Sequence, residues 1–137
     1  MKDDSVFDHW CLRSILRVRY NDRISNEEIR RRCQNIQSLV CAIQQNRLRL
    51  AGHVLRRPQQ EITRISITAQ PRSDWKRRRG GQNKTWKDSL KMDLENVTGP
   101  TIYGYRRWQS NWLSITGELA QNRNQWRALT RDITGAS

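Results

Sequence analysis

The sequence predicts a mainly α-helical protein in which two small helical regions are joined by a basic, mostly irregular loop. Only 35% of the residues are apolar, which is too few for one large core. The apolar residues recur at helical spacing in short runs within residues 5–57 and 84–134. The intervening residues lack this period and contain a run of cations. We therefore predict three parts, which are residues 1–57, 58–83 and 84–137.

The first predicted helix covers residues 6–19, and the polar residues 20–22 end it. Side chains at helical spacing give it one face that we expect to be buried. This face contains Phe7, Trp10, Cys11, Ser14, Ile15 and Val18.

A second, short helix is predicted over residues 26–35. Ser25 and Glu28 have the spacing of a capping box, in which Ser25 accepts a first-turn N–H and Glu28 reaches back. The arginine run 30–32 lies near its end. There the cations either complement the helix dipole or contact an anion, and the sequence leaves both alternatives open.

The third and longest helix is predicted over residues 39–57, after a Ser38 cap. Its apolar face is predicted to contain Leu39, Ile43, Leu50 and Val54. The opposite face contains Gln45, Arg49, His53 and Arg56. Arg47 falls inside the apolar arc, so its charged end must extend out to solvent, or the helix bends near Asn46. Gly52 either weakens the helix slightly or allows another element to approach closely.

Residues 58–83 are predicted to be irregular apart from one short strand. Within them, residues 61–68 alternate between apolar and polar side chains, which is typical of a strand. Residues 70–83 combine proline, glycine, asparagine and charged side chains, which is typical of a loop.

Three short helices are predicted in the last part. The first begins at a cap-like segment, residues 85–88, and its apolar stripe contains Trp86, Leu90, Leu94 and Val97. After an irregular segment at residues 101–111, the apolar positions of the other two helices are Trp112, Ile115 and Leu119, followed by Trp126, Leu129 and Ile133. Asn122 is the predicted cap of the last helix. Core packing is expected for the tryptophans on stripes, which are Trp10, Trp86, Trp112 and Trp126.

The charge of the chain points to a polyanionic partner. There are 26 Lys and Arg residues against 13 Asp and Glu residues, a formal net charge of +13. Such a surface binds phosphates by displacing counterions, and its arginine-rich composition favours nucleic acid, RNA or DNA, over anionic lipid. No apolar run is long enough to span a membrane, and the N-terminus lacks a signal-peptide core. We therefore expect no membrane partner and an intracellular location, nuclear or cytoplasmic.

The strongest binding candidate is a cluster that we call the basic strap, which consists of Lys76, Arg77, Arg78, Arg79 and Lys84. Gly80 and Gly81 would let its backbone approach a phosphate closely. Trp75 and Trp86 flank the basic strap, and Trp75, like Trp108, lies in a loop beside arginines where it could stack on unpaired bases. Arg72 and Lys87 extend the same basic region. The alternatives are a solvated linker and a nuclear-import signal.

The second candidate is the polar face of the third helix. Arg49, His53 and Arg56 form one stripe that would follow a phosphate backbone, with Arg57 beside it. A single histidine on such a face is also a common hydrogen-bonded structural group, so His53 alone is weak evidence.

The residues predict neither a metal site nor a catalytic centre. The three cysteines, at positions 11, 33 and 41, have no zinc-finger spacing and are expected to be free thiols in a reducing compartment. No phosphate loop or nucleophile elbow occurs, and carboxylates are too sparse to favour a metal-dependent nuclease. We expect no cofactor.

Five segments, in order, resemble the C-terminal tail of reverse transcriptases encoded by non-long-terminal-repeat retrotransposons. They are "WCLRSILRVRYNDRISNEEIRRRCQ" at 10–34, "RLRLAGHVLRRP" at 47–58, "KRRRGGQNKTW" at 76–86, "DLENV" at 93–97 and "ELAQNRNQWRAL" at 118–129. The resemblance spans essentially the whole chain, and its first segment resembles the region that leads out of the polymerase thumb.

The resemblance implies a non-catalytic part of an endonuclease and reverse transcriptase. The family's catalytic carboxylates lie upstream of this tail, and the one Asp-Asp pair here, at residues 3–4, lacks the Tyr-x-Asp-Asp or Phe-x-Asp-Asp turn. We expect a module that contacts template RNA or target DNA. The alternative is a packing element for the missing polymerase domain, or a relic of a truncated element without independent activity.

Overall fold

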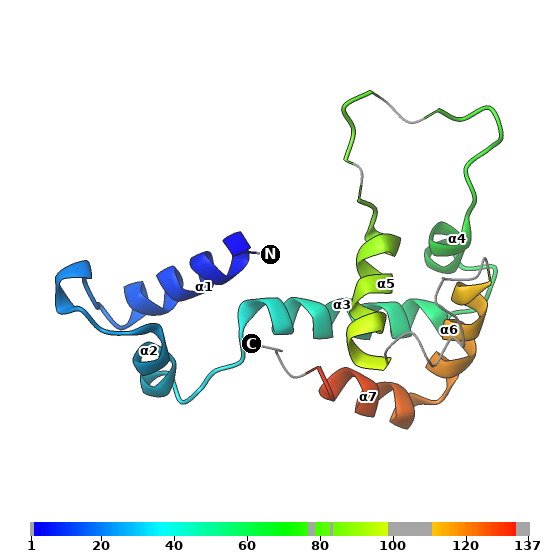
Figure 1. Cartoon of the computed structure of the whole chain (residues 1–137). Helices are drawn as coiled ribbons and strands as arrows, with labels where there is room; N and C mark the ends of the chain where they lie inside the picture. The colour runs from blue at the N-terminus through cyan, green and yellow to red at the C-terminus, as the bar shows by residue number, and fades with distance from the viewer. Residues whose placement is uncertain (1, 77–78, 83, 99–110, 134–137) are drawn as a thin grey trace. The chain divides into compact units, whose positions relative to one another are not determined.

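The computed structural model describes residues 2–76, 79–82, 84–98 and 111–133 (Figure 1). Across these residues the secondary structure consists of seven α-helices and one short 3₁₀ turn, with no strand, which confirms the predicted helical class. The contacts divide the chain into two compact units, formed within residues 1–44 and within residues 45–133. We call them the N-terminal unit and the C-terminal unit. Their boundary lies inside the third helix, whereas the sequence prediction placed its boundaries after residues 57 and 83.

The N-terminal unit contains α1 (Lys2–Ile15), the 3₁₀ turn η1 (Tyr20–Asp22), α2 (Asn26–Arg32) and the beginning of α3 (Leu39–Leu55). Its core is small, and its buried apolar side chains are Leu12, Ile29 and Cys41. The predicted buried face of the first helix is wrong, because Phe7, Trp10 and Ile15 are all more than half exposed. The opposite side of α1, which carries Asp8 and Leu12, faces α2 and the start of α3 instead.

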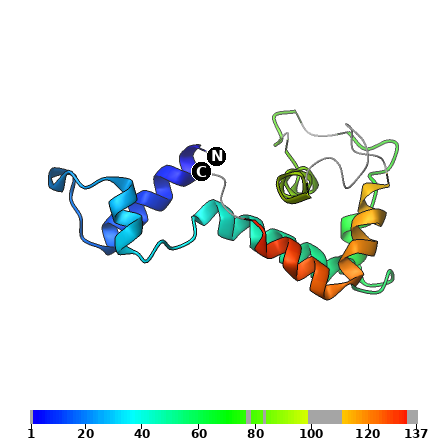
Figure 2. The same ribbon diagram turned by 60° about the horizontal axis from the view of Figure 1, so that its bottom comes forward.

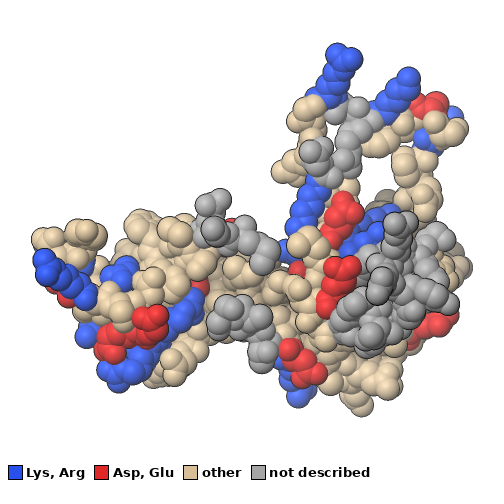
Figure 3. Space-filling view, viewed as in Figure 1, with Lys and Arg blue, Asp and Glu red and all other residues tan. Residues whose placement is uncertain are grey.

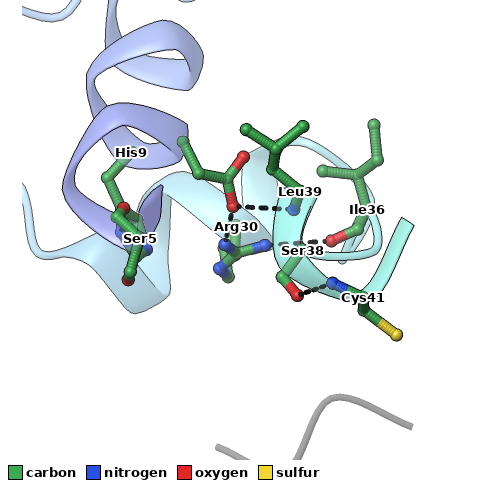
Figure 4. A network of polar contacts seen from close by, with 8 residues as sticks. Ser5, His9, Arg30, Ile36, Ser38, Leu39 and Cys41 are labelled. Carbon is green, nitrogen blue, oxygen red and sulfur yellow. Dashed lines mark hydrogen bonds and ion pairs between the residues drawn. The ribbon is translucent and has the colours of Figure 1, made fainter. Parts of the chain in front are cut away.

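Polar contacts of the Asp8 carboxylate with Arg30 and Leu39 hold this unit together, and Figure 4 shows these two partners with Ile36 and Ser38. The Asp8 carboxylate accepts hydrogen bonds from the Arg30 guanidinium and from the Leu39 backbone N–H, the latter at 3.3 Å. Arg30 also donates to the Ile36 carbonyl oxygen at 3.0 Å. Ser38 caps α3 as predicted, because its hydroxyl oxygen accepts the Cys41 N–H at 3.3 Å. One carboxylate therefore fixes the C-terminal end of α2 and the N-terminus of α3 to α1.

At the start of α2, one of the two hydrogen bonds of the predicted capping box is present. The Ser25 hydroxyl oxygen accepts the Glu28 N–H at 3.2 Å. Glu28 does not reach back, however, because its carboxylate accepts from Arg31 at 2.7 Å and from Arg32 at 2.9 Å. These two hydrogen bonds lower the pKa of Glu28 to about 2. The arginine run 30–32 is thus occupied by carboxylates, which favours a structural role over anion contact.

The C-terminal unit contains most of α3, then α4 (Ile62–Thr68), α5 (Trp86–Thr98), α6 (Trp112–Gln121) and α7 (Arg123–Arg131). Its buried apolar side chains come from all five helices and from the second residue after α7, and they are Leu48, Ala51, Leu55, Ile67, Leu90, Leu94, Trp112, Ala120, Trp126 and Ile133. Full burial of one leucine side chain stabilises the folded state by about 1.5–3 kcal/mol relative to leaving it exposed. The caps that the sequence predicted at Thr85 and Asn122 are both present.

The predicted strand at residues 61–68 is wrong, because these residues form α4. The described residues offer no neighbouring strand to satisfy its backbone, whereas a helix satisfies most of its backbone bonds internally. Ile67 is buried, and Arg64, one helical turn earlier, packs on α6. There Gly117 leaves the necessary space, since a Cβ at that position would lie 3.2 Å from the Arg64 guanidinium.

The predicted apolar face of α3 is also wrong. Leu50 is 54% exposed and Ile43 is exposed as well, whereas Leu48, Ala51 and Leu55 are buried. Trp126 of α7 packs on the buried face of α3, where its indole N–H donates to the Leu48 carbonyl oxygen at 2.9 Å. The indole also lies directly over Gly52, where an added Cβ would be 2.2 Å from Nε1. Gly52 is therefore a point of close approach, one of the two predicted alternatives.

Arg47 does not extend to solvent as predicted. Its guanidinium donates to the Asp93 carboxylate of α5 at 2.8 Å, and the Asp93 side chain is buried. The ion pair links α3 to α5 inside the C-terminal unit. The first of the two predicted alternatives, extension to solvent, is therefore wrong, because the sequence did not show which carboxylate would meet this arginine.

The tryptophans divide into two groups. Trp112 and Trp126 are buried as predicted, and the Lys91 ammonium lies 5.1 Å from the centroid of the Trp112 ring. The prediction of core packing is wrong for Trp10, which is 63% exposed, and for Trp86, which is also exposed. Trp10 lies on α1 and Trp86 is the first residue of α5, and at both positions the side chain is open to solvent.

Candidate nucleic-acid interface

The main candidate site is a cavity of about 340 Å³ between α3 and α7. The two helices lie side by side and run antiparallel (Figures 1 and 2). Six basic side chains line the cavity, and we call the set the arginine groove: Arg49, His53, Arg56, Arg123, Arg127 and Arg131. Both walls of one hollow are therefore cationic.

Helical spacing places these side chains on facing stripes. The three α3 residues, 49, 53 and 56, are four and three positions apart, and the three α7 arginines are four positions apart. Residues three or four apart share one face of a helix. Trp126 and Thr130 complete the lining, and each is only 3% exposed. The contact of Trp126 with Gly52 brings the two stripes together.

The electrostatics of the groove are unbalanced. No acidic side chain of the described residues lines it. Arg56 donates to the Ala120 carbonyl oxygen at 2.9 Å, and Arg49 donates to the Asn46 side-chain oxygen at 3.3 Å. The pKa of Arg56 lies below its ordinary value because burial removes water and because Arg123 and Arg127 repel its charge. A bound anion would relieve this repulsion.

The basic strap lies in the loop between α4 and α5 (Figures 1 and 3). Arg77 and Arg78 lie outside the described residues. The other members of the basic strap, Lys76, Arg79 and Lys84, are exposed. Gly80 adopts φ +73°, a left-handed conformation that favours glycine. Trp75 is 59% exposed, as a stacking platform requires.

Three of the remaining predicted contact residues have partners within the chain. Arg57 lies 3.7 Å from the Glu61 carboxylate, and Arg72 lies 3.7 Å from that of Asp74. Lys87 donates to the Ala69 carbonyl oxygen at 3.3 Å, which ties the start of α5 to the end of α4. Lys87 therefore closes the base of the loop that carries the basic strap.

Sequence reasoning identified only one wall of the arginine groove. Arg49, His53 and Arg56 were singled out, whereas the three arginines of α7 were missed. The sequence does contain a pattern that indicates this wall, because Arg123, Arg127 and Arg131 repeat every four residues beside the apolar stripe of Trp126. The sequence prediction used only the apolar stripe, as a packing surface. The other predicted platform, Trp108, lies outside the described residues.

Other kinds of site receive little support. The described residues contain no group of three or more His, Cys, Asp or Glu side chains placed to hold a metal ion. Within the same part of the chain, no helix has the length and apolar character needed to cross a membrane. Comparison of the chain with protein-family models, with curated proteins and with solved structures finds no match.

Proposed function

We propose that this chain binds nucleic acid through its C-terminal unit, without catalysis of its own. The observation that carries the proposal is the arginine groove, in which five arginines and one histidine surround a cavity with no acidic lining residue among those described. Guanidinium groups bind phosphate through paired hydrogen bonds and keep their charge at every physiological pH. A polyphosphate chain supplies the anions that this hollow lacks.

The distribution of charge supports the same function. Residues 45–133 contain 18 Lys and Arg against 7 Asp and Glu, a net charge of +11. Residues 1–44 contain 8 Lys and Arg against 6 Asp and Glu, a net charge of +2. Nearly all of the excess charge therefore belongs to the unit that contains the arginine groove and the basic strap. Concentrated positive charge attracts nucleic acid from a distance and retains it through counterion release.

The resemblance to the tail of retrotransposon reverse transcriptases gives this binding a context. In that context the chain is the part of a polymerase that grips template RNA or target DNA. The arginine groove includes residues of two resembling segments, 47–58 and 118–129, and the basic strap lies in a third, 76–86. The proposal assigns to these segments the common task of holding phosphates in an intracellular compartment.

A second candidate function is packing against another domain, such as the missing polymerase. The observation that favours it is the apolar side of α1, where Val6, Phe7, Trp10 and Ile15 are exposed. The Phe7 and Trp10 rings stack with centroids 6.1 Å apart, so they present one continuous surface. This role concerns the N-terminal unit and is compatible with nucleic-acid binding by the C-terminal unit.

Fluorescence anisotropy tests the main proposal. The whole chain is titrated into labelled single-stranded RNA, structured RNA and duplex DNA at several salt concentrations. We expect an affinity for at least one of them that falls steeply with salt. The double variant Arg123→Gln/Arg127→Gln should bind at least tenfold more weakly, by about 1.4 kcal/mol or more, because two guanidinium groups can no longer form charge-assisted hydrogen bonds with phosphates.

The matched control is Arg31→Gln/Arg32→Gln, which removes the same charge from the N-terminal unit. It should leave the affinity nearly unchanged. Equal effects of both double variants would mean that only total charge matters, and the arginine groove would then not be the site. Binding to anionic vesicles but to no nucleic acid would reject the proposal in favour of a lipid surface.

A further inference from the structure

The two walls of the arginine groove are short rows of basic side chains that line the same cavity. At 1.5 Å per residue, the α3 row from Arg49 to Arg56 is about 10 Å long, and the α7 row from Arg123 to Arg131 is about 12 Å long. The rows run antiparallel, and the two α7 arginines nearest the start of that helix lie close enough to Arg56 to repel it. Arginines of both rows therefore line the same cavity and lie close together at one end of it.

This arrangement fits one phosphate chain better than a duplex. A duplex carries its phosphates on two strands, separated by grooves about 6–12 Å wide. Cations that bind it must follow two separate lines of phosphates. Here the cations converge from opposite walls on a hollow of about 340 Å³, which is at the small end of ligand sites. Only a single line of phosphates meets both walls at once.

The floor of the groove offers nothing that would read a base. The Trp126 indole N–H already donates to the Leu48 carbonyl oxygen, and the Thr130 hydroxyl donates to the Arg127 carbonyl oxygen at 2.9 Å. Both side chains are buried, so neither the indole face nor the hydroxyl is presented to a base. The remaining lining consists of five arginines and His53, and arginines that contact phosphates carry no sequence information.

We infer that the arginine groove binds a single nucleic-acid strand by its phosphate backbone, without sequence preference, with the bases directed away from the protein. At about 3.4 Å per nucleotide of a stacked strand, its length spans about three phosphates. The inference rests on the proposed function and specifies the ligand of the same site. It also separates two tasks, since the exposed Trp75 beside the basic strap remains the platform for bases.

The test compares ligands of equal length, which are oligouridine, oligoadenosine and the blunt RNA duplex of the two. Each is titrated against the whole chain and against Arg127→Gln, Arg127→Lys and the control Arg31→Gln. We expect similar affinity for the two single strands and at least tenfold weaker binding of the duplex. In Arg127→Gln, the slope of log affinity against log salt should flatten by about 0.7 for each single-strand phosphate that the variant no longer neutralises. Arg127→Lys should recover the slope but only part of the affinity, because lysine keeps the charge and loses the paired hydrogen bonds.

The outcomes separate this inference from the proposed function. If the duplex binds as tightly as the single strands, or if oligouridine and oligoadenosine differ more than tenfold, the inference is wrong while nucleic-acid binding stands. The same holds if Arg127→Gln binds like wild type and only Lys76→Gln/Arg79→Gln loses affinity. If none of the three ligands binds wild type at any salt, the proposed function fails. Circular dichroism of each variant checks that α7 is intact, which is expected because the Arg127 side chain is exposed.

Discussion

Two helices of this chain each carry three arginines and use them in opposite ways. In α2, the arginines 30–32 all pair with carboxylates, one with Asp8 and two with Glu28. In α7, Arg123, Arg127 and Arg131 form no ion pair with any described residue and line the arginine groove instead. The space-filling view shows acidic and basic side chains interleaved over α2 (Figure 3). The number of arginines on a helix thus says little about function, and the presence of partners says more.

The two sets of arginines also differ in their positions along their helices. The arginine run 30–32 lies at the C-terminal end of α2, where the helix dipole stabilises cations. Arg123 is the first residue of α7, where the dipole disfavours a cation. Like charges four residues apart on a helix add a further cost of about 0.2–0.5 kcal/mol per pair. Arg123 therefore opposes the stability of its own helix, as expected of a residue that serves a ligand, whereas Arg131 lies in the last turn, where the dipole favours a cation.

Gly52→Ala should disrupt the contact between α3 and α7. The new methyl group would lie 2.2 Å from the Trp126 Nε1 atom, so the indole must move and its hydrogen bond to Leu48 is broken. We expect a decrease of about 3 kcal/mol in the free energy of unfolding, from overpacking and one buried hydrogen bond. Nucleic-acid affinity should fall as well, because the two walls separate. Urea denaturation followed by circular dichroism measures the first effect.

Leu50→Ala is the control for this change, because it alters the exposed side of the same helix. Leu50→Ala should lower the free energy of unfolding by less than about 1 kcal/mol. A larger cost for Leu50→Ala than for Gly52→Ala would mean that the face predicted from the sequence is the buried one after all.

The ion pair between Arg30 and Asp8 should stabilise the N-terminal unit. Asp8→Ala leaves Arg30 half-buried without its carboxylate and removes the acceptor of the Leu39 N–H. We expect the N-terminal unit to be destabilised by about 2 kcal/mol, because an ion pair at a partly buried site is costly to break from one side. Hydrogen exchange of α1 and α2 amides is the suitable measurement. Protection should fall in residues 1–44 and persist in the C-terminal unit. A uniform decrease over both units would show that they unfold together.

A smaller effect follows from pH. The hydrogen bonds from Arg31 and Arg32 hold the pKa of Glu28 at about 2, against an ordinary value of 4.5. Because the folded value is the lower one, the stabilisation is fully present above pH 4.5 and is lost as the pH falls towards 2. Carboxyl chemical shifts from nuclear magnetic resonance give this pKa directly. A value near 4.5 would mean that the two arginines do not hold the carboxylate in solution, and the contrast between α2 and α7 would weaken.

Local chemistry explains which features could be predicted from the sequence. Helix starts at Ser25, Ser38, Thr85 and Asn122 depend on side chains within three residues, so the caps were found. The buried face of α3 depends on Trp126, 78 positions away from Leu48. The pattern of residues 39–57 admits two apolar arcs, and only tertiary packing chooses between them. Half of the candidate site was missed for the same reason, since the sequence did not show which helix faces α3.

Substitutions in the two sets of arginines should change stability in opposite directions. Arg123→Gln removes a cation from the N-terminus of α7 and from its repulsion with Arg56 and Arg127. The chain should become more stable by about 0.5 kcal/mol, while its nucleic-acid affinity falls. Arg31→Gln removes a hydrogen bond to Glu28, so stability should fall slightly and affinity should stay the same. Thermal denaturation measures the stability of the two variants, and fluorescence anisotropy measures their affinity for nucleic acid. If both substitutions lower stability and leave binding intact, the α7 arginines are structural and the arginine groove is not a binding site.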